Sequence, residues 1–401
     1  MSDVVPDLVP DLVPGAPAGE PDVAAAIGSP PRDTAELPFV WAGSPWSLAG
    51  PCVFNAFMTV ITVGIYNFWG RTEIRRRLWA CVRLDGEPLV YHGTGLEMFK
   101  GFTAAALVVL LPIFLLSTAL VIMFGQGSQS WMIFQLGLLV VVYPVLKAFA
   151  TYRARRYRLA RTSWRGIRGS VSGSASEFAF LSWATSILTP LTLGWILPWR
   201  ELYIQRFLTG DTMLGDRKLS LRASSGSLYL RFALLWVGTI ALYFAVVAGV
   251  VGIVAGQGVR MMSPADWVKV PRLIWLELAC VVLAVVFVWS LISSFYYSSL
   301  YNLTASTTVM LLPGADRQWT PVRFKLTTKG RHLVWLFVTN QLLTYASVFV
   351  LKPVATARSL KYFTQHLSVV GAFDPATLRQ NPNGAIAEGE GLAQAFDFDA
   401  F

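Results

Sequence analysis

The chain has 401 residues, of which 54% are hydrophobic and only 14% charged, with a formal net charge of +10. A soluble globular protein carries about 25% charged residues, so this composition excludes an ordinary soluble domain and indicates apolar surface placed in lipid. The three cysteines lie far apart and match no metal-binding spacing, which excludes a disulfide framework and a zinc motif.

Both ends of the chain differ in composition from its middle. Residues 1–37 are rich in proline, repeat the phrase VPDL, and lack the basic and apolar regions of a signal peptide. We expect a disordered N-terminal tail there and an acidic, solvated C-terminal tail at 381–401. The residues between them, 38–380, are predicted to form a multi-pass membrane domain.

Four apolar stretches are long enough to cross a bilayer, which takes about 20 residues. They are arranged as two predicted transmembrane hairpins, near 102–150 and near 230–297. The phrase GQG follows the first apolar stretch of each hairpin. The predicted spans are 102–124, 131–150, 230–256 and 273–297.

Lysine and arginine predict the orientation of these spans. They are concentrated in 71–83, in 147–168 and in 317–331. The positive-inside rule places all three segments, and with them both termini, in the cytoplasm. The aromatic and basic run within 147–168 also has the composition of a nucleic-acid binder, but beside a span we interpret it as contact with anionic lipid headgroups. We therefore expect the bilayer as partner, and no nucleic acid.

One phrase occurs twice. "ITVGIYNFW" at 61–69 and "LTLGWILPW" at 191–199 share a Gly and a terminal Trp, and a weaker copy at 339–363 has Phe349 and Val354 in their places. Repetition at a fixed offset predicts a repeated structural unit, here near 38–100, 163–227 and 318–376. The signature residues, interpreted as turn formers and interfacial anchors, are Gly64, Tyr66, Trp69, Gly194 and Trp199.

Each copy combines an apolar stretch, a basic helix such as "RTEIRRRLWACVRL", and short alternating segments that predict strands. The expected fold is therefore mainly α: a polytopic helical membrane protein with internal repeats and small cytoplasmic β elements. Basic residues flank the second copy on both sides, which favours a re-entrant or interfacial helix. A full span is the alternative, so the sequence leaves four or seven spans open.

The segment 55–102, "NAFMTVITVGIYNFWGRTEIRRRLWACVRLDGEPLVYHGTGLEMFKGF", resembles the signature of the YjgN family of bacterial inner-membrane proteins. The segments 162–170 and 323–344 are similar to later blocks of that family, and the likeness covers roughly 38–400. The resemblance implies a multi-pass protein of the bacterial inner membrane. It implies no activity and supplies no catalytic residues.

Constellations that carry enzyme chemistry are scarce in this sequence. The three histidines, His92, His332 and His366, have no cysteine or carboxylate at metal-ligand spacing. "GTGLEMFKG" is not a phosphate-binding loop, and we interpret the glycines beside His92 as a turn. We expect no enzyme, no metal and no cofactor.

Hydroxyl and amide side chains recur along the repeated apolar stretches. They either line a polar path, as in the broken helices of transporters, or hold neighbouring helices together. The candidate residues for this path are Asn55, Thr59, Thr62, Thr189, Thr192 and Asn340.

Charged side chains add two further candidates. Glu277 is a carboxylate within a predicted span, which marks a functional candidate unless it pairs with Arg272 or reaches the interface. The basic helices supply predicted contacts with anionic lipid headgroups: Arg75, Arg76, Arg77 and Arg206.

These patterns support two functional hypotheses. The repeats, the broken apolar segments and the aligned hydroxyl groups favour transport or permeation of a small solute, lipid or ion. The alternative is a non-transporting membrane scaffold or envelope-maintenance protein that binds anionic lipid through its basic helices. The substrate and the oligomeric state do not follow from the sequence.

Overall fold

The computed structural model describes residues 36–381 apart from 257–271, 314–318 and 372, and all statements below concern these residues. The predicted tails at 1–37 and 381–401 lie almost wholly outside this part of the chain. So does the loop that follows the second GQG phrase.

The described strands form one antiparallel sheet. Its order is β3-β2-β1-β11-β10-β9-β8-β7-β6-β5-β4, so β3 and β4 are the two ends of the order. Only Leu89 separates these two strands in the chain, and the sheet therefore returns on itself as a nearly closed ring. The strands are β1 (Glu36–Trp41), β2 (Val82–Leu84), β3 (Glu87–Pro88), β4 (Val90–Tyr91), β5 (Thr162–Trp164), β6 (Ile167–Val171), β7 (Thr212–Leu214), β8 (Arg217–Leu221), β9 (Thr308–Pro313), β10 (Trp319–Leu326) and β11 (Leu367–Val370).

This ring corrects the expectation of small β elements. The strands are short, as the alternating segments predicted, but they belong to one sheet that spans the chain from Glu36 to Val370. β1 pairs with β11, so that Leu37 lies opposite Val369. Backbone pairing between segments distant in the chain leaves no local mark in the sequence, because each strand's partner is fixed by topology.

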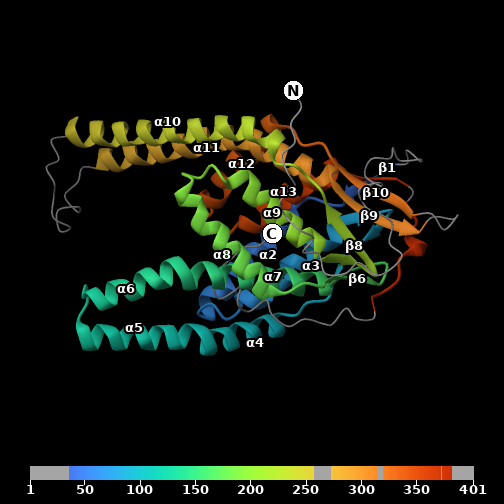
Figure 1. The fold of residues 1–401 in the computed structure, drawn as a ribbon, viewed down its shortest axis with the longest axis horizontal. Helices are drawn as coiled ribbons and strands as arrows, with labels where there is room; N and C mark the ends of the chain where they lie inside the picture. The colour runs from blue at the N-terminus through green and yellow to red at the C-terminus, as the bar shows by residue number, and fades with distance from the viewer. Residues whose placement is uncertain (1–35, 257–271, 314–318, 372, 382–401) are drawn as a thin grey trace, which may run out of the picture.

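Each helical hairpin connects two strands of the ring that are hydrogen-bonded to each other. Three are short: α2–α3 between β1 and β2, α8–α9 between β6 and β7, and α12–α13 between β10 and β11. Two are long: α4–α7 between β4 and β5, and α10–α11 between β8 and β9. We number these hairpins first (α2–α3), second (α4–α7), third (α8–α9), fourth (α10–α11) and fifth (α12–α13). They lie on one side of the sheet, and the second and fourth project furthest from it (Figure 1).

The helices have the following bounds: α2 (Ala49–Ile61), α3 (Asn67–Cys81), α4 (Gly95–Ala105), α5 (Leu111–Phe124), α6 (Gln129–Gly137), α7 (Tyr143–Ala160), α8 (Ala175–Leu191), α9 (Leu197–Gly210), α10 (Gly226–Gly256), α11 (Arg272–Ser306), α12 (Gly330–Ala346) and α13 (Lys352–His366). Short 3₁₀ helices cover Pro45–Leu48 and Pro375–Thr377.

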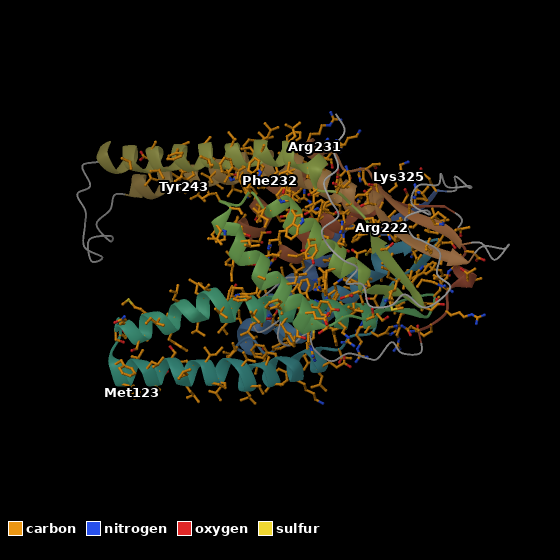
Figure 2. The ribbon with its side chains drawn as sticks, viewed as in Figure 1. Met123, Arg222, Arg231, Phe232, Tyr243 and Lys325 are labelled. Carbon is orange, nitrogen blue, oxygen red and sulfur yellow. The ribbon has the colours of Figure 1, made fainter. Side chains whose placement is uncertain are left out.

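Four helical segments are long and apolar enough to cross a membrane, in agreement with the four predicted stretches. They are Gly95–Phe124, Gln129–Ala160, Gly226–Gly252 and Ala279–Ser306. Figure 2 shows side-chain nitrogens gathered at the ring end of the molecule, where Arg222 and Lys325 lie, whereas Met123 marks the far apolar end of the second hairpin.

Proline interrupts both arms of the second hairpin in the same way. A π-helical turn, Ala106–Leu110 or Leu138–Val142, precedes Pro112 and Pro144. Pro144 has no N–H for the carbonyl one turn earlier, that of Val140, and the indole Nε1 of Trp183 in α8 donates to this oxygen at 3.2 Å. A neighbouring hairpin therefore satisfies the carbonyl that proline leaves open.

The three short hairpins turn with the same backbone geometry. In the first, the N–H of Gly64 donates to the Thr59 carbonyl at 2.7 Å; Gly194 donates to Thr189 at 2.7 Å and Phe349 to Thr344 at 2.8 Å. The residue before each donor, Val63, Leu193 or Val348, has a positive φ near 50°, and each donor also has a positive φ, between 65° and 90°. The fifth hairpin keeps the turn although Phe349 stands where the others have glycine, a position that costs a non-glycine residue about 1 kcal/mol or more.

Because both flanks of each short hairpin are paired strands of one sheet, the chain leaves the ring and returns to it. A full membrane crossing by 177–199 would instead carry its flanks to opposite sides, whereas β6 and β7 hydrogen-bond to each other through Val171 and Thr212. The arms of the short hairpins contain 13 to 17 residues, so that α2 extends about 20 Å and α8 about 25 Å.

The interior of the ring is filled with apolar side chains. One buried cluster draws members from strands around the whole ring: Leu84, Trp164, Met310, Leu312, Val322 and Val369, with Leu378 from beyond the last strand. Within β10, Val322 points into this cluster and Arg323 away from it, as alternation in a strand requires. The ring is thus a packed core.

The segment after β11 covers the ring at the end opposite the hairpins; we call residues 373–381 the C-terminal strap. Phe373 lies against Trp164 with ring centroids 5.8 Å apart, and Leu378 is buried in the ring core. The N–H of Asp216 donates to the Arg379 carbonyl at 2.9 Å. A Cβ on Gly215 would collide with that carbonyl oxygen, so glycine lets the strap approach the β7–β8 turn.

Candidate functional site

A cavity of about 470 Å³ lies between the first and fifth hairpins, which are neighbours around the ring. Buried Ile74, Leu78, Val354 and Ala357 join the two hairpins beside it. Its lining comes from α2 (Cys52, Asn55, Ala56, Thr59, Val60), from α3 (Asn67, Gly70, Arg71, Ile74, Arg75) and from the fifth hairpin (Val348, Phe349, Val350, Lys352, Pro353, Thr356).

Three cationic side chains contribute to this lining. Arg71 and Arg75 stand one turn apart on α3, and Lys352 is the first residue of α13. No aspartate or glutamate belongs to the lining among the described residues. Arg75 is 5% exposed, and its Nη1 donates to the Tyr91 hydroxyl at 3.0 Å. The cavity lining therefore contains three cationic side chains, each of which has further contacts.

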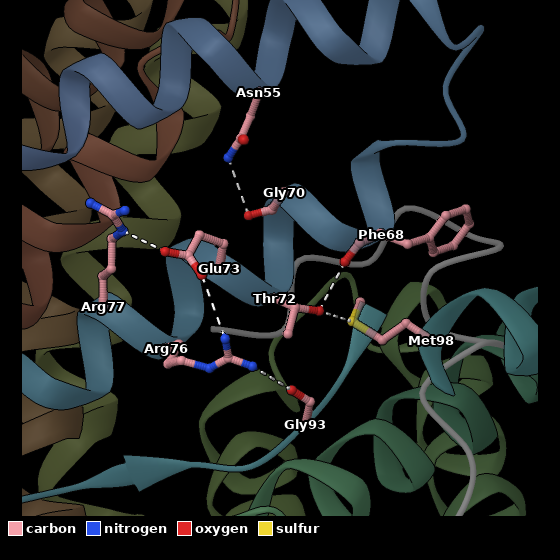
Figure 3. Close-up of polar contacts among 9 residues, drawn as sticks. All are labelled: Asn55, Phe68, Gly70, Thr72, Glu73, Arg76, Arg77, Gly93 and Met98. Atoms are coloured by element: carbon pink, nitrogen blue, oxygen red, sulfur yellow. Dashed lines mark hydrogen bonds and ion pairs between the residues drawn. The ribbon is translucent and has the colours of Figure 1, made fainter. Parts of the chain in front are cut away.

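Amide and hydroxyl side chains also line the cavity. The Nε of Arg71 donates to Asn67 Oδ1 at 3.2 Å, which orients the guanidinium along α3. Asn55 Nδ2 donates to the Gly70 carbonyl at 3.3 Å, joining the two arms of the hairpin (Figure 3). Thr59 Oγ1 donates to the carbonyl of Asn55 at 2.7 Å. These contacts hold the polar wall in one conformation.

The other end of the cavity is apolar and open. Val60, Val348 and Phe349 lie at or next to the hairpin turns and are 79%, 78% and 58% exposed. Buried Cys52 and Ile74 line the end nearer the ring. The cavity therefore runs from an exposed apolar rim to a buried wall that contains Arg75.

The structure distributes the predicted polar path over three hairpins. Asn55 and Thr59 line the cavity, whereas Asn340 is buried within the fifth hairpin and donates to the Ala355 carbonyl at 3.0 Å. Thr189 and Thr192 lie on and just after α8, and their hydroxyls donate to carbonyls of their own helix.

The hydroxyl of Thr62 has a local role in the hairpin turn. It accepts the N–H of Tyr66 at 2.9 Å, and the hydroxyl of Ser347 accepts that of Leu351 at 3.0 Å in the fifth hairpin. Thr192 accepts from Ile196 at 3.4 Å. These hydroxyls stabilise the turns, and of the six candidates for a path only Asn55 and Thr59 line the cavity.

The signature residues organise the first and third hairpins. Gly64 and Gly194 adopt positive φ values of 90° and 82° in the turns. Trp69 lies so close to Gly95 that a Cβ there would be 2.8 Å from its ring. Tyr66 contacts Phe54 edge-on, and Trp199 stacks on Tyr203 with centroids 5.0 Å apart. Trp69 and Trp199 stay about 40% exposed, and their predicted role as interfacial anchors remains a prediction.

The arginines predicted to contact headgroups occupy different environments. Arg75 is buried, unlike the exposed face expected for it, because it reaches the Tyr91 hydroxyl. Arg76 and Arg77 are exposed and pair with Glu73, at 3.6 and 2.8 Å (Figure 3). Arg206 donates to the Ala223 carbonyl at 3.0 Å.

Glu277 lies in the second turn of α11 and is half-buried. The side chain of Arg272, its predicted partner, lies outside the described side chains. The functional role of Glu277 therefore remains a prediction.

Sequence reasoning missed Arg71 and Lys352 as cavity residues. Arg71 was interpreted as part of the basic run 71–83 and Lys352 was not singled out, because nothing local shows that the turn of the fifth hairpin packs beside α3. It also missed three tyrosine–carboxylate hydrogen bonds. Two join neighbouring hairpins, from Tyr152 to Asp211 at 2.6 Å and from Tyr296 to Glu201 at 2.7 Å, and the third joins the arms of the second hairpin, from Tyr157 to Glu97 at 2.6 Å.

The chain is similar in sequence to bacterial inner membrane proteins. The inner membrane protein YjgN of Salmonella typhimurium is 25% identical over 166 residues, which cover 41% of this chain and 39% of that protein. The protein of the same name from Escherichia coli K12 is 26% identical over 162 residues, 40% of this chain and 38% of the relative. These matches span about two fifths of the length of the curated relatives. No solved structure matches the chain significantly.

The relatives' names and the four apolar helices together imply a lipid bilayer environment. A family model described as a bacterial protein of unknown function, DUF898, matches residues 36–395, which include the ring, all five hairpins and the cavity. The chain belongs to the DUF898 family.

Proposed function

We propose that the protein is a non-conducting scaffold of the bacterial inner membrane that binds anionic lipid. The observation that carries this proposal is the filled ring. Leu84, Trp164 and Val322 meet at its centre, and the C-terminal strap covers one end with Leu378. A solute moving along the ring axis would have to displace a packed apolar core.

The tips of the short hairpins support contact with lipid. Val63, Leu193 and Val348 are 91%, 75% and 78% exposed, although each occupies a backbone conformation in which glycine is preferred. Apolar side chains at such positions suit an environment of acyl chains better than water. We infer that the hairpins enter the bilayer beside the four long helices without crossing it, because hydrogen bonds within the turns satisfy the backbone at the exposed tips.

The distribution of charge supports an orientation for this scaffold. Arg222 and Lys325 lie at the ring end, and Arg231 lies in the part of α10 nearer the ring than exposed Tyr243 (Figure 2). By the positive-inside rule, this distribution favours a cytoplasmic ring with both termini on the same side. We further propose that the three short hairpins are copies of one unit, which their shared turn hydrogen bonds support.

Transport of a small solute, lipid or ion is the second candidate. Asn55 and Thr59 favour it, because both line a cavity that lies beside the ring core. A route of this kind would run between the first and fifth hairpins and not along the ring axis. The proposed scaffold role assigns no catalytic activity to the chain.

Sealed proteoliposomes distinguish the two candidates. Vesicles containing the protein should retain potassium and a trapped sugar as long as protein-free vesicles do, while spin-labelled anionic lipid is enriched over zwitterionic lipid at the protein surface. A saturable flux that depends on the protein would overturn the scaffold role. Loss of that flux in Thr59→Val, with Thr103→Val as the hydroxyl control outside the cavity, would then support transport.

A further inference from the structure

We propose that the protein recognises membrane curvature: its three short hairpins form a wedge in the leaflet next to the ring, so that it prefers a bilayer that bulges toward the ring. The inference rests on the proposed insertion of these hairpins and extends it to a preferred shape of membrane. Three features of the molecule support it: the depth that the short hairpins reach, their apolar tips, and the number of helices in each leaflet.

The tip of the third hairpin lies far from the end of the fourth hairpin. The indole Nε1 of Trp236 in α10 donates to the carbonyl of Leu193, in the tip, at 2.8 Å. Beyond Trp236, α10 continues to Gly256, a length of about 30 Å. The hydrocarbon core of a bilayer is also about 30 Å thick, so the tip ends in the leaflet nearer the ring.

The first hairpin reaches a similar depth beside the second. Phe68, close to the turn, contacts Phe99 and Phe102 of α4 with ring centroids 5.4 and 5.2 Å apart. The apolar helical segment that contains Phe102 continues to Phe124, about 30 Å further on. Both short hairpins therefore end where most of the neighbouring long hairpin still lies ahead.

The tips of the short hairpins present apolar side chains to their surroundings. Ile65 and Trp195 are exposed in the turns of the first and third hairpins, and Phe349 is exposed in the turn of the fifth. Shallow insertion places such side chains among acyl chains, which removes their apolar surface from water. Apolar segments that enter a bilayer by only about 5–10 Å bind in a manner that depends on curvature.

The leaflet nearer the ring accommodates more protein than the far leaflet. In the described part of the chain, five hairpins leave the ring, whereas the second and fourth project furthest from it (Figure 1). A helix is about 10 Å across, so the six arms of the short hairpins occupy roughly 500 Å² of the nearer leaflet alone. A bilayer relieves this difference in area by bending, with the nearer leaflet on the convex side.

Vesicles of mixed size test this preference with the full-length protein. In a chain without Cys52, Cys81 and Cys280, a dye is attached at position 218, an exposed residue of β8, and an impermeant quencher identifies molecules whose ring faces outward. Because the outer leaflet is convex, ring-outward molecules should be several-fold denser per unit of lipid on the smallest vesicles than on the largest. Ring-inward molecules should show no such enrichment.

Asparagine at the tips removes the apolar wedge but suits the turns. Val63, Leu193 and Val348 have positive φ values, which asparagine adopts more readily than a branched apolar residue. The triple variant Val63→Asn, Leu193→Asn and Val348→Asn should therefore fold, and its enrichment on small vesicles should disappear. Met123→Asn, at the exposed far end of the second hairpin, is the control and should keep the enrichment.

Each outcome decides between defined alternatives. Equal density of ring-outward molecules on small and large vesicles would overturn the wedge, while enrichment of anionic lipid at the protein surface would leave the proposed lipid-binding function standing. Persistence of the size preference in a folded triple variant would overturn the role of the tips. Thermal unfolding shows whether that variant is folded, and the comparison of the two orientations in the unaltered protein decides the inference without it.

Discussion

The side-chain amide of Asn55 donates a hydrogen bond to the backbone carbonyl of Gly70, fifteen residues further along the chain and on the opposite arm of the first hairpin. Asn340 makes the same link to Ala355 in the fifth hairpin, across the same interval. These links hold the arms of the two hairpins that enclose the cavity, so the geometry of the site depends on them.

The contact between Asn55 and Gly70 predicts that Gly70 does not tolerate replacement by a residue with a Cβ atom. A Cβ at position 70 would lie 3.0 Å from Cγ of Asn55, so Gly70→Ala should lower the free energy of unfolding by about 1–3 kcal/mol through overpacking. Thermal unfolding in detergent measures the change. Gly50→Ala is the matched control, because its Cβ meets nothing within 4 Å and alanine favours the helix. Equal melting temperatures for the two variants would contradict the packing argument.

The hairpin tips predict a pattern of labelling. In a chain without Cys52, Cys81 and Cys280, a single cysteine at 63, 193 or 348 should resist a membrane-impermeant thiol reagent from either side. A nitroxide at these positions should collide with oxygen more often than with a water-soluble nickel complex, because the tips lie among acyl chains.

Position 217, in the ring strand β8, is the control for this experiment, and it should label from the cytoplasmic side. Rapid labelling of position 193 from the periplasmic side would indicate a crossing segment. Labelling of all three tips from the cytoplasm would place them in water and contradict insertion.

The C-terminal strap predicts that the ring core depends on Leu378. This side chain is 6% exposed within the core, so Leu378→Ala should destabilise the protein by about 2–5 kcal/mol. Gln380→Ala, at an exposed residue two positions on, should change the melting temperature far less. A small effect of Leu378→Ala would show that the strap does not seal the ring.

Asp211 predicts a dependence of stability on pH. Burial raises the pKa of this carboxyl, while the hydrogen bond from Tyr152 opposes the rise. A raised pKa in the folded state means that its stabilising contribution is present at low pH and lost as pH rises from the ordinary aspartate pKa through the folded one. Asp211→Asn should therefore gain stability relative to the unaltered protein as pH increases above about 4.

Melting temperatures from pH 4 to 8 measure the stability of Asp211→Asn relative to the unaltered protein. Tyr152→Phe should shift the pH dependence of stability in the opposite direction. Without its hydroxyl the ionised carboxylate loses a hydrogen-bond donor, so the fall in stability with pH should steepen. If the difference in melting temperature between Asp211→Asn and the unaltered protein stayed constant with pH, the raised pKa of Asp211 would be contradicted.

Much of the membrane architecture could be predicted from short segments of the sequence. The four long apolar helices follow from continuous runs of apolar residues, which is why the stretches from 102 to 124 and from 131 to 150 agree with helices in the structure. The turn at Gly64 was equally visible, because glycine at a fixed place in a repeated phrase marks a positive φ. The corresponding turn at Phe349 carries no such mark, although its hydrogen bonds are the same.

Only part of the candidate site could be predicted from the sequence. Asn55 and Thr59 were singled out and do line the cavity, whereas Thr62 and Thr192 serve the turns. Arg75 was assigned to an exposed basic face, but Tyr91 draws it into the interior. Whether a polar side chain lines a cavity, closes a turn or bonds its own helix depends on its neighbours in space.

The sequence by itself determined that this protein is a membrane protein with two long apolar hairpins, because hydrophobicity and charge act over segments of about 20 residues. Only the tertiary structure decided that the eleven described strands form one nearly closed ring, with β1 joined to β11, and that Lys352 and Arg71 line the same cavity. Strand pairing and cavity lining join residues hundreds of positions apart, and the energy of such contacts depends on how the chain closes on itself.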